Sequence, residues 1–258
     1  EVRSYQPGDD IRTIDWRVTA RTGSAHTKMF REERERPVLL LVDQRPAMFF
    51  GSRTCFKSVL AAELAAMLCW AALRNGDRVG GLVFGCGGHR EVRPKRSRRS
   101  VLSLLHNVDE LNHLLGTQQE DCSMTFGDAL IDLRRIAKPG SAIFIVSDFD
   151  RALDNGAKEH LFQLSQHMEV TAIHCSDPLE RDLPRAGRYS VTDGNDRTLL
   201  DTGSKHARRE FQQLYETRFT ELQDNYGRLG IPVIEASTEQ APLDILASYY
   251  GCRERRAS

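Results

Sequence analysis

The sequence has no hydrophobic run long enough to cross a lipid bilayer. Its longest apolar stretches are residues 38–42 and residues 61–73, the second interrupted by Glu63, and a membrane span needs about 18 to 20 residues. No secretory signal precedes them. We therefore expect a cytoplasmic protein. Because the sequence opens on Glu1 rather than Met, this expectation concerns the present stretch alone, and a membrane anchor upstream of Glu1 stays open.

Metal-binding and common catalytic motifs are also missing. The six cysteines form no C-x-x-C pair, and the eight histidines show no H-x-x-x-H spacing, so neither set predicts a metal site. The sequence contains no phosphate-binding loop, no G-x-S-x-G elbow and no G-x-G-x-x-G turn. We therefore expect no enzymatic activity and no cofactor. The cysteines are expected to be free thiols in a reducing compartment: Cys55, Cys69, Cys86, Cys122, Cys175 and Cys252.

An excess of charge of either sign is absent. Lys and Arg number 36 and Asp and Glu number 36, with 40% apolar residues, a composition typical of soluble globular proteins and not of nucleic-acid binders. One basic run stands out: Arg90, Arg93, Lys95, Arg96, Arg98 and Arg99. Since no aromatic residues are interleaved with it, we expect a solvated loop and helix start; contact with nucleic acid is the alternative.

What the sequence does contain is an alternation of short apolar runs with helical patterns. Strands are predicted near residues 38–42, 79–84, 90–94, 142–146, 169–174 and 231–235, the last at a sheet edge because of Pro232. Helices are predicted near residues 54–74, 97–115, 125–136, 156–167, 205–229 and 242–249, and a β-hairpin over residues 187–202. The aromatic stripe of the helix at 205–229 is expected to face the core. The predicted fold class is α/β, with a mostly parallel sheet and helices on both faces.

Three polar residues are expected to meet at one edge of this sheet. Asp43 and Asp148 each follow a buried strand, and Thr125 precedes a helix. This layout is similar to the von Willebrand factor A domain, in which D-x-S-x-S, a Thr and an Asp hold Mg²⁺ through oxygen ligands. Here Arg45 and Ala47 occupy the two serine positions. The resemblance thus implies a degenerate metal site in which Arg45 replaces the cation; a structural salt bridge and residual metal binding are the alternatives.

The amino-terminal sequence resembles the bacterial DUF58 family. The matching residues are Tyr5, Pro7, Gly8, Asp9, Asp10, Arg12, Asp15, Trp16 and Arg21, and the match continues through 31–34, 147–149, 177–180 and 183–184. Membership implies a von Willebrand A-like fold. It also implies association with MoxR-type AAA+ ATPases, for which these proteins are presumed adaptors or substrates.

Residues 1–36 also predict local structure independently of the family resemblance. Pro7 and Gly8 predict a turn, and Asp9 or Asp10 can cap a short helix from Ile11 to about Ala20. Asp15 lies within reach of Arg12 and Arg21. Such a network around Trp16 either clamps this segment onto the sheet domain or binds a partner. We expect a signature segment over 1–36 that packs on the core, a von Willebrand A-like domain over 37–250 and a basic tail over 251–258.

The expected function is that of a protein-interaction adaptor for a MoxR-type ATPase and a client protein. The alternative is a Mg²⁺-dependent binder or enzyme at the same sheet edge.

Overall fold

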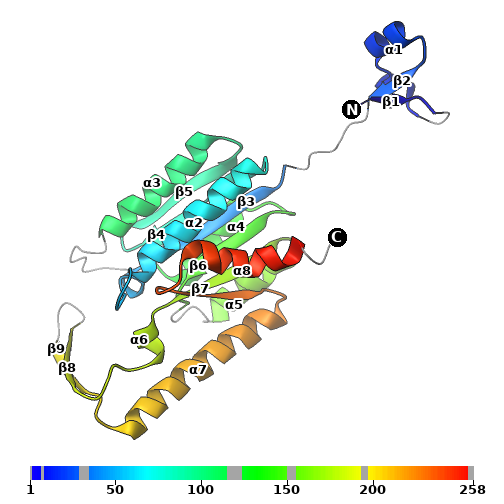
Figure 1. Cartoon of the computed structure of the whole chain (residues 1–258). Coiled ribbons are helices and arrows are strands. Elements are labelled where there is room, and N and C mark those ends of the chain that lie inside the picture. The colour runs from blue at the N-terminus through cyan, green and yellow to red at the C-terminus, as the bar shows by residue number, and fades with distance from the viewer. Residues whose placement is uncertain are drawn as a thin grey trace. The chain divides into compact units, whose positions relative to one another are not determined.

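The computed structural model describes residues 2–6, 9–28, 35–114, 124–149, 155–192 and 197–254 (Figure 1). The chain divides into two compact units, Glu1–Glu35 and Arg36–Ser258. The turn predicted at Pro7 and Gly8 and the family-like stretch at 31–34 lie outside the described residues.

A six-stranded sheet forms the centre of the second unit. Its strands, in the order β10-β7-β6-β3-β4-β5, are β10 (Val233–Ser237), β7 (Glu169–Ser176), β6 (Ala142–Ser147), β3 (Pro37–Gln44), β4 (Arg78–Gly85) and β5 (Gly88–Lys95). Neighbouring strands run parallel, apart from β5, which pairs antiparallel with β4. The predicted α/β fold class with a mostly parallel sheet is confirmed.

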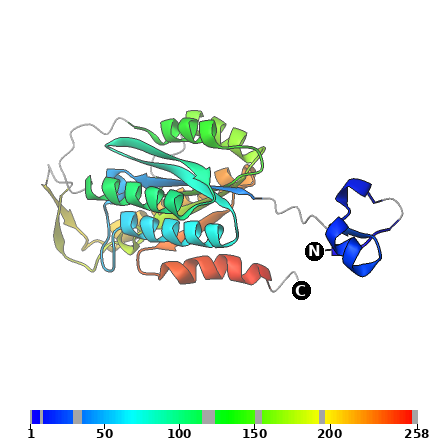
Figure 2. The same cartoon turned by 90° about the horizontal axis from the view of Figure 1, so that it is seen from above.

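Helices cover both faces of this sheet (Figure 2). On one face lie α2 (Lys57–Arg74), α3 (Arg98–Leu114) and α8 (Pro242–Glu254); on the other lie α4 (Phe126–Ile136), α5 (Asn155–Ser165) and α7 (Lys205–Arg228). Side chains of β3 alternate between the two apolar layers, so that Leu40 packs toward α2 and Leu41 toward α4. Asp43 continues the alternation and lies on the side of α4.

Several boundaries differ from the predictions. Strand β10 begins at Val233 rather than residue 231, because Pro232 has no N–H to donate; its place at the sheet edge was predicted correctly. The hairpin comprises β8 (Arg188–Thr192) and β9 (Arg197–Asp201), and its turn at 193–196 lies outside the described residues. Helix α6 (Pro178–Arg181) was not predicted. Helix α8 continues to Glu254, into the stretch expected to be a tail.

The expectation for helix α7 holds for most of the stripe. Leu222 and Tyr226 are buried, and the rings of Tyr215 and Phe219 lie 6.5 Å and 5.2 Å from that of His174, whereas Leu214 is 50% exposed. None of the helices within the described ranges combines the length and apolarity that a membrane crossing requires.

The prediction that all cysteines are free is wrong for Cys86, which is disulfide-bonded. Cys55, Cys69 and Cys175 are free. Cys122 lies outside the described residues.

The amino-terminal unit is more broken than the single predicted helix. Strand β1 (Val2–Ser4) pairs antiparallel with β2 (His26–Lys28), and between them lie η1 (Ile11–Thr13) and α1 (Trp16–Thr22). Ile14 interrupts the helix because it makes a β-bridge with Thr27. Its neighbour Asp15 then caps α1, accepting hydrogen bonds from the N–H groups of Arg17 and Val18.

The two other aspartates of the amino-terminal unit have separate roles. Asp10 caps η1, while Asp9 forms an ion pair of 2.6 Å with Arg3. Trp16 is 67% exposed. The residues of this unit therefore do not bury its largest apolar side chain.

Candidate functional site

The carboxyl ends of three parallel strands bring acidic groups to one edge of the sheet. Asp43 is the next-to-last residue of β3, Asp148 directly follows β6, and Asp177 directly follows β7. All three are buried. Burying a carboxylate is unfavourable unless cations or hydrogen-bond donors compensate it, so the partners of each one determine what this edge can do.

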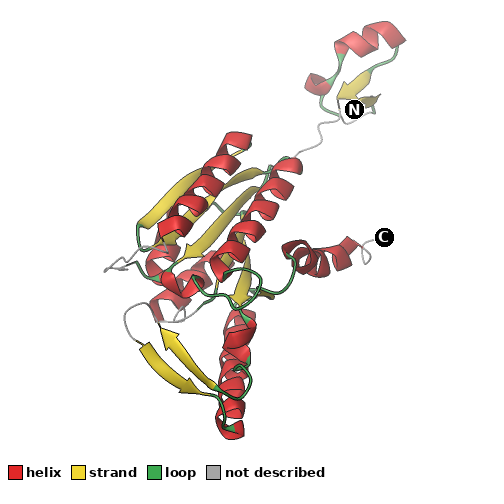
Figure 3. Ribbon diagram, turned by 60° about the vertical axis from the view of Figure 1, so that its left-hand side comes forward, coloured by secondary structure: helices red, strands yellow, loops and turns green. Residues whose placement is uncertain are grey.

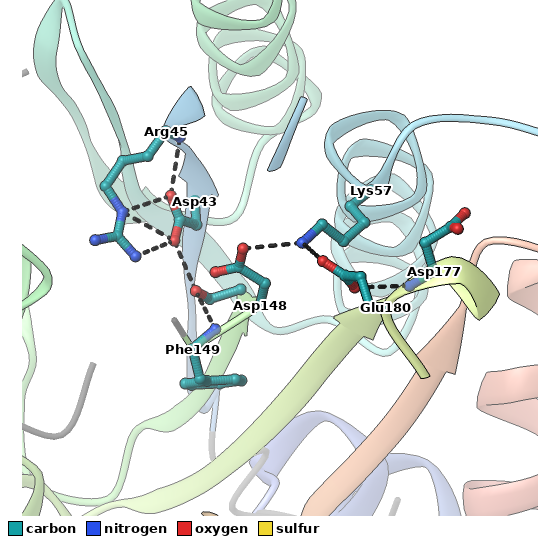
Figure 4. Close-up of polar contacts among 8 residues, drawn as sticks. Asp43, Arg45, Lys57, Asp148, Phe149, Asp177 and Glu180 are labelled. Atoms are coloured by element: carbon teal, nitrogen blue, oxygen red, sulfur yellow. Dashed lines mark hydrogen bonds and ion pairs between the residues drawn. The ribbon is translucent and has the colours of Figure 1, made fainter. Parts of the chain in front are cut away.

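Arg45 compensates the buried negative charge of Asp43 by hydrogen bonds from its backbone N–H and its guanidinium group (Figure 4). Its backbone N–H donates to Oδ1 over 2.9 Å, its Nε to Oδ1 over 3.0 Å, and its Nη2 to Oδ2 over 2.7 Å. The guanidinium carbon also lies 5.3 Å from the ring centre of Phe84 and 6.0 Å from that of Phe126. Ser147 adds a hydroxyl donor 2.6 Å from Oδ2 of Asp43.

The charge state of Asp43 reflects two opposing effects. Burial raises the pKa of the Asp43 carboxyl, whereas the hydrogen bonds and charge of Arg45 lower it; burial is the larger effect, and the pKa is raised. A guanidinium cannot lose its proton in a protein. The positive charge beside Asp43 is therefore permanent.

Asp148 has a different cation, Lys57, the first residue of α2. The Nζ of Lys57 lies 3.0 Å from Oδ2 of Asp148 and 2.6 Å from Oε1 of Glu180, and its side chain is 2% exposed. Burial alone would lower the pKa of Lys57, but the two carboxylates outweigh it and raise the pKa. Burial raises the pKa of Glu180, and Lys57 opposes that shift.

A second set of bonds ties the surrounding loops together. Oδ2 of Asp177 accepts from the backbone N–H of Ser52 over 2.9 Å and from the hydroxyl of Thr238 over 2.6 Å. Glu180 accepts the backbone N–H of Asp177 in a capping box at the start of α6. Glu180 thus links the helix cap to Lys57.

Phe149 joins the charged groups to an aromatic cluster. Its N–H donates to the hydroxyl oxygen of Ser147 over 3.0 Å, and its backbone has a φ of 55°, a left-handed conformation that costs about 1 kcal/mol or more outside glycine. Its ring packs 5.3 Å from Tyr226 and 6.3 Å from His174. His174 Nδ1 has no hydrogen-bond partner among the described residues, and burial lowers the His174 pKa to about 4.

Thr125, the third residue predicted at this edge, uses its hydroxyl group within its own helix. Its hydroxyl donates to Oδ2 of Asp128 over 2.7 Å and accepts the Asp128 N–H over 3.1 Å, which closes the capping box of α4. The next residue, Phe126, reaches the guanidinium of Arg45. Within the part of the chain that the structure describes, no group of three or more His, Cys, Asp or Glu residues is arranged to hold a metal ion.

Sequence reasoning identified Asp43, Arg45 and Asp148 at this edge but missed Lys57, Ser147 and Glu180 as their partners. Lys57 gave one usable signal, since it is the charged residue that opens a long apolar helix. The family signature residues from Tyr5 to Arg21 lie in the other unit.

The basic run predicted to be solvated lies along β5 and at the start of α3. Arg93 and Lys95 are exposed on the edge strand, and Arg90 lies 3.7 Å from Glu110.

Comparisons with known proteins place the chain among bacterial relatives. A family profile described as protein of unknown function DUF58 matches residues 1–221. An uncharacterized protein of Mycobacterium tuberculosis, Rv1480, is 26% identical over 258 residues, which is 100% of this chain and 80% of that protein. The uncharacterized protein YeaD of Bacillus subtilis is 33% identical over 79 residues, 31% of this chain and 18% of that protein.

Solved structures show likeness of fold. The conserved hypothetical protein BatB of Bacteroides thetaiotaomicron has a TM-score of 0.50 at 16% identity, covering 86% of this chain and all of that chain. The SpRpn10 VWA domain has a TM-score of 0.46 at 11% identity, covering 83% of this chain and 95% of that chain. The von Willebrand factor A-like fold class predicted from the sequence is confirmed.

Proposed function

The chain belongs to the DUF58 family, and we propose that it is a non-enzymatic adaptor whose carboxyl-end sheet edge binds a protein partner without a metal ion. The observation that carries this proposal is the pair of cations at the edge. Arg45 lies on Asp43, and Lys57 lies between Asp148 and Glu180, so each of these carboxylates already has a cation beside it.

The residues at this edge do not fit Mg²⁺. A hard cation needs several oxygen ligands, and two hydroxyl positions of the von Willebrand A pattern are Arg45 and Ala47 here. The hydroxyl of Thr125 is used within α4, and Lys57 holds Asp148. We therefore interpret the edge as a degenerate metal site with a fixed, metal-like charge.

Apolar side chains beside the edge provide contact area for a partner. Phe49, Phe50 and Phe56, on the segment between Arg45 and α2, are 43%, 40% and 40% exposed, and the rings of Phe49 and Phe56 lie 4.5 Å apart. Exposed aromatic groups next to a neutralised polar cluster are typical of protein interfaces. The resemblance to DUF58 proteins that accompany MoxR-type ATPases makes such an ATPase the partner that we propose.

The first test measures binding of the purified chain to a MoxR-type AAA+ ATPase from the same genome, with and without EDTA. We expect the same affinity in both. Arg45→Ala should weaken binding about ten-fold or more, because it leaves Asp43 buried without its cation. Arg74→Ala is the matched control, since Arg74 is exposed in the last turn of α2, at the opposite end of that helix from Lys57.

Titration with MgCl₂ distinguishes the proposed adaptor from the alternative function, a Mg²⁺-dependent binder or enzyme. We expect no binding heat and no change in melting temperature for the natural chain. Sub-millimolar Mg²⁺ binding by the natural chain, or loss of partner binding in EDTA, would contradict the proposal and favour the metal-dependent alternative.

A further inference from the structure

The β8–β9 hairpin is a small sheet of its own. Neither strand joins the six-stranded sheet, and Figures 1 and 3 show the hairpin beside the end of α7, away from the central strands. Its described side chains are exposed on both faces, with Leu200 the most covered. Two strands alone are marginally stable in water, whereas three or more are stable. The hairpin therefore gains stability from any further strand.

The edge of β9 lacks the proline found in or beside the two edge strands of the six-stranded sheet, and its charged residues, Arg197 and Asp201, stand only at its two ends. Edge strand β5 contains Pro94 and the exposed charges of Arg93 and Lys95, and Pro232 precedes edge strand β10. Such residues prevent pairing with another chain. Strand β9 has no proline, and its central residue, Leu199, is 64% exposed.

The hydrogen-bond pattern of the hairpin shows which backbone groups are available on β9. The N–H of Thr202 donates to the carbonyl of Gly187 over 2.9 Å, so these two residues form a hydrogen-bonded pair. Bonded and non-bonded pairs alternate in an antiparallel ladder, and the register pairs Leu200 with Tyr189 and Leu199 with Ser190. The N–H and C=O groups of residues 197, 199 and 201 therefore point away from β8.

We propose that β9 pairs antiparallel with β9 of a second copy of this chain, about a two-fold axis at Leu199. Leu199 then opposes the partner's Leu199, and both supply the outward backbone groups that a bonded pair requires. Arg197 opposes the partner's Asp201, and the symmetry repeats that charge pair at the other end. The sequence Arg-Thr-Leu-Leu-Asp over 197–201 is thus self-complementary in hydrogen bonding, in apolar contact and in charge.

The same register on β8 lacks this complementarity. A two-fold axis at Ser190 would place Arg188 opposite Thr192, which provides no charge pair. The observations therefore favour the β9 edge and a four-stranded sheet in the order β8-β9-β9-β8. Because the contact is short, the dimer should be weak.

The experiment uses charge inversion and measures the association of the full chain by sedimentation equilibrium from about 1 µM to 1 mM. Arg197→Asp places two carboxylates opposite each other at both ends, and Asp201→Arg does the same with two cations. Because Asp201→Arg also removes the 3.8 Å ion pair of Asp201 with Arg188 in its own hairpin, the mixture of the two variants is the deciding sample. Each variant alone should show a dissociation constant raised ten-fold or more. An equimolar mixture of the two variants restores opposite charges at both ends and should associate as the natural chain does. Arg209→Asp, an equal charge change at an exposed position of α7, is the control and should leave association unchanged.

Reversible association of the natural chain, its loss in both single variants and its recovery in the mixture would together support the proposal. A natural chain that stays monomeric throughout the concentration range would overturn it, and the β9 edge would then be open to a strand of a different protein. Association that persists unchanged in Arg197→Asp would also overturn it, because the contact would lie elsewhere.

Discussion

Lys57 is an ammonium group held in the protein interior by two carboxylates from distant parts of the chain. Lys57→Met should lower the free energy of unfolding by about 3 to 5 kcal/mol at pH 7, because it leaves Asp148 and Glu180 buried near each other without a cation. Urea unfolding measures the change. Lys158→Met, at an exposed position of α5, is the matched control and should shift stability by less than about 0.5 kcal/mol. A loss below about 1 kcal/mol in the Lys57 variant would show that water reaches these carboxylates.

His174 makes stability depend on pH. Its pKa is about 4 in the folded chain, first because of burial and further because of the charge of Lys57, while Asp148 opposes the shift. As the pH falls below about 6.5, the unfolded chain takes up a proton that the folded chain does not bind. The free energy of unfolding should therefore fall by about 3 kcal/mol from pH 7 to pH 4 through this group.

His174→Phe should remove that part of the pH dependence and keep the aromatic contacts with Phe149 and Phe219. The comparison must be a difference between variants, because the raised pKa values of Asp43 and Glu180 make those groups titrate toward the same range. His113→Gln, with a side chain 76% exposed, serves as control. Equal slopes for the natural chain and His174→Phe would contradict the assignment.

The residues of the site were partly predictable because they obey a local rule. Asp43 and Asp148 each end an apolar run, and the ends of parallel strands meet at one edge. Their partners obey no local rule: Lys57 pairs with Asp148 across 91 residues and with Glu180 across 123. Such pairs depend on how helix α2 and helix α6 pack, which a single sequence does not reveal.

At the scale of elements, buried strands were predicted most accurately. Strands β3, β4, β6 and β7 all occur where continuous apolar runs predict them. Errors arose where a tertiary contact overrides a local pattern. The bridge between Ile14 and Thr27 splits the predicted amino-terminal helix, and the four-residue helix α6 depends on its capping box rather than on periodicity.

The amino-terminal unit offers a prediction at the same scale. Because Trp16 is 67% exposed, Trp16→Ala should change the free energy of unfolding of the chain by less than about 1 kcal/mol. Capture of the ATPase should weaken with it if the family signature is a binding surface. Urea unfolding and pull-down on the same preparations measure both. A loss of about 3 kcal/mol or more would instead show that Trp16 docks within the molecule as a structural clamp.

For the whole molecule, the balance of 36 basic and 36 acidic residues means that copies of the chain do not repel one another strongly near neutral pH. Net charge away from zero keeps proteins apart. The pairing proposed for β9 should therefore be strongest near the isoelectric point of about 7.3, and moderate salt should weaken it through its two exposed charge pairs.

The path of the chain between β7 and β10 has a consequence for folding. These neighbouring strands are separated in sequence by α6, the hairpin and α7, so β10 pairs with β7 only after a long loop has closed. The entropic cost of closing a loop increases slowly with its length, and the chain loses this entropy before the contact can stabilise it. We therefore expect β10 and α8 to join a sheet that β3, β4, β6 and β7 have already assembled. We also expect the segment between β7 and β10 to tolerate changes in length during evolution with little effect on the stability of the core.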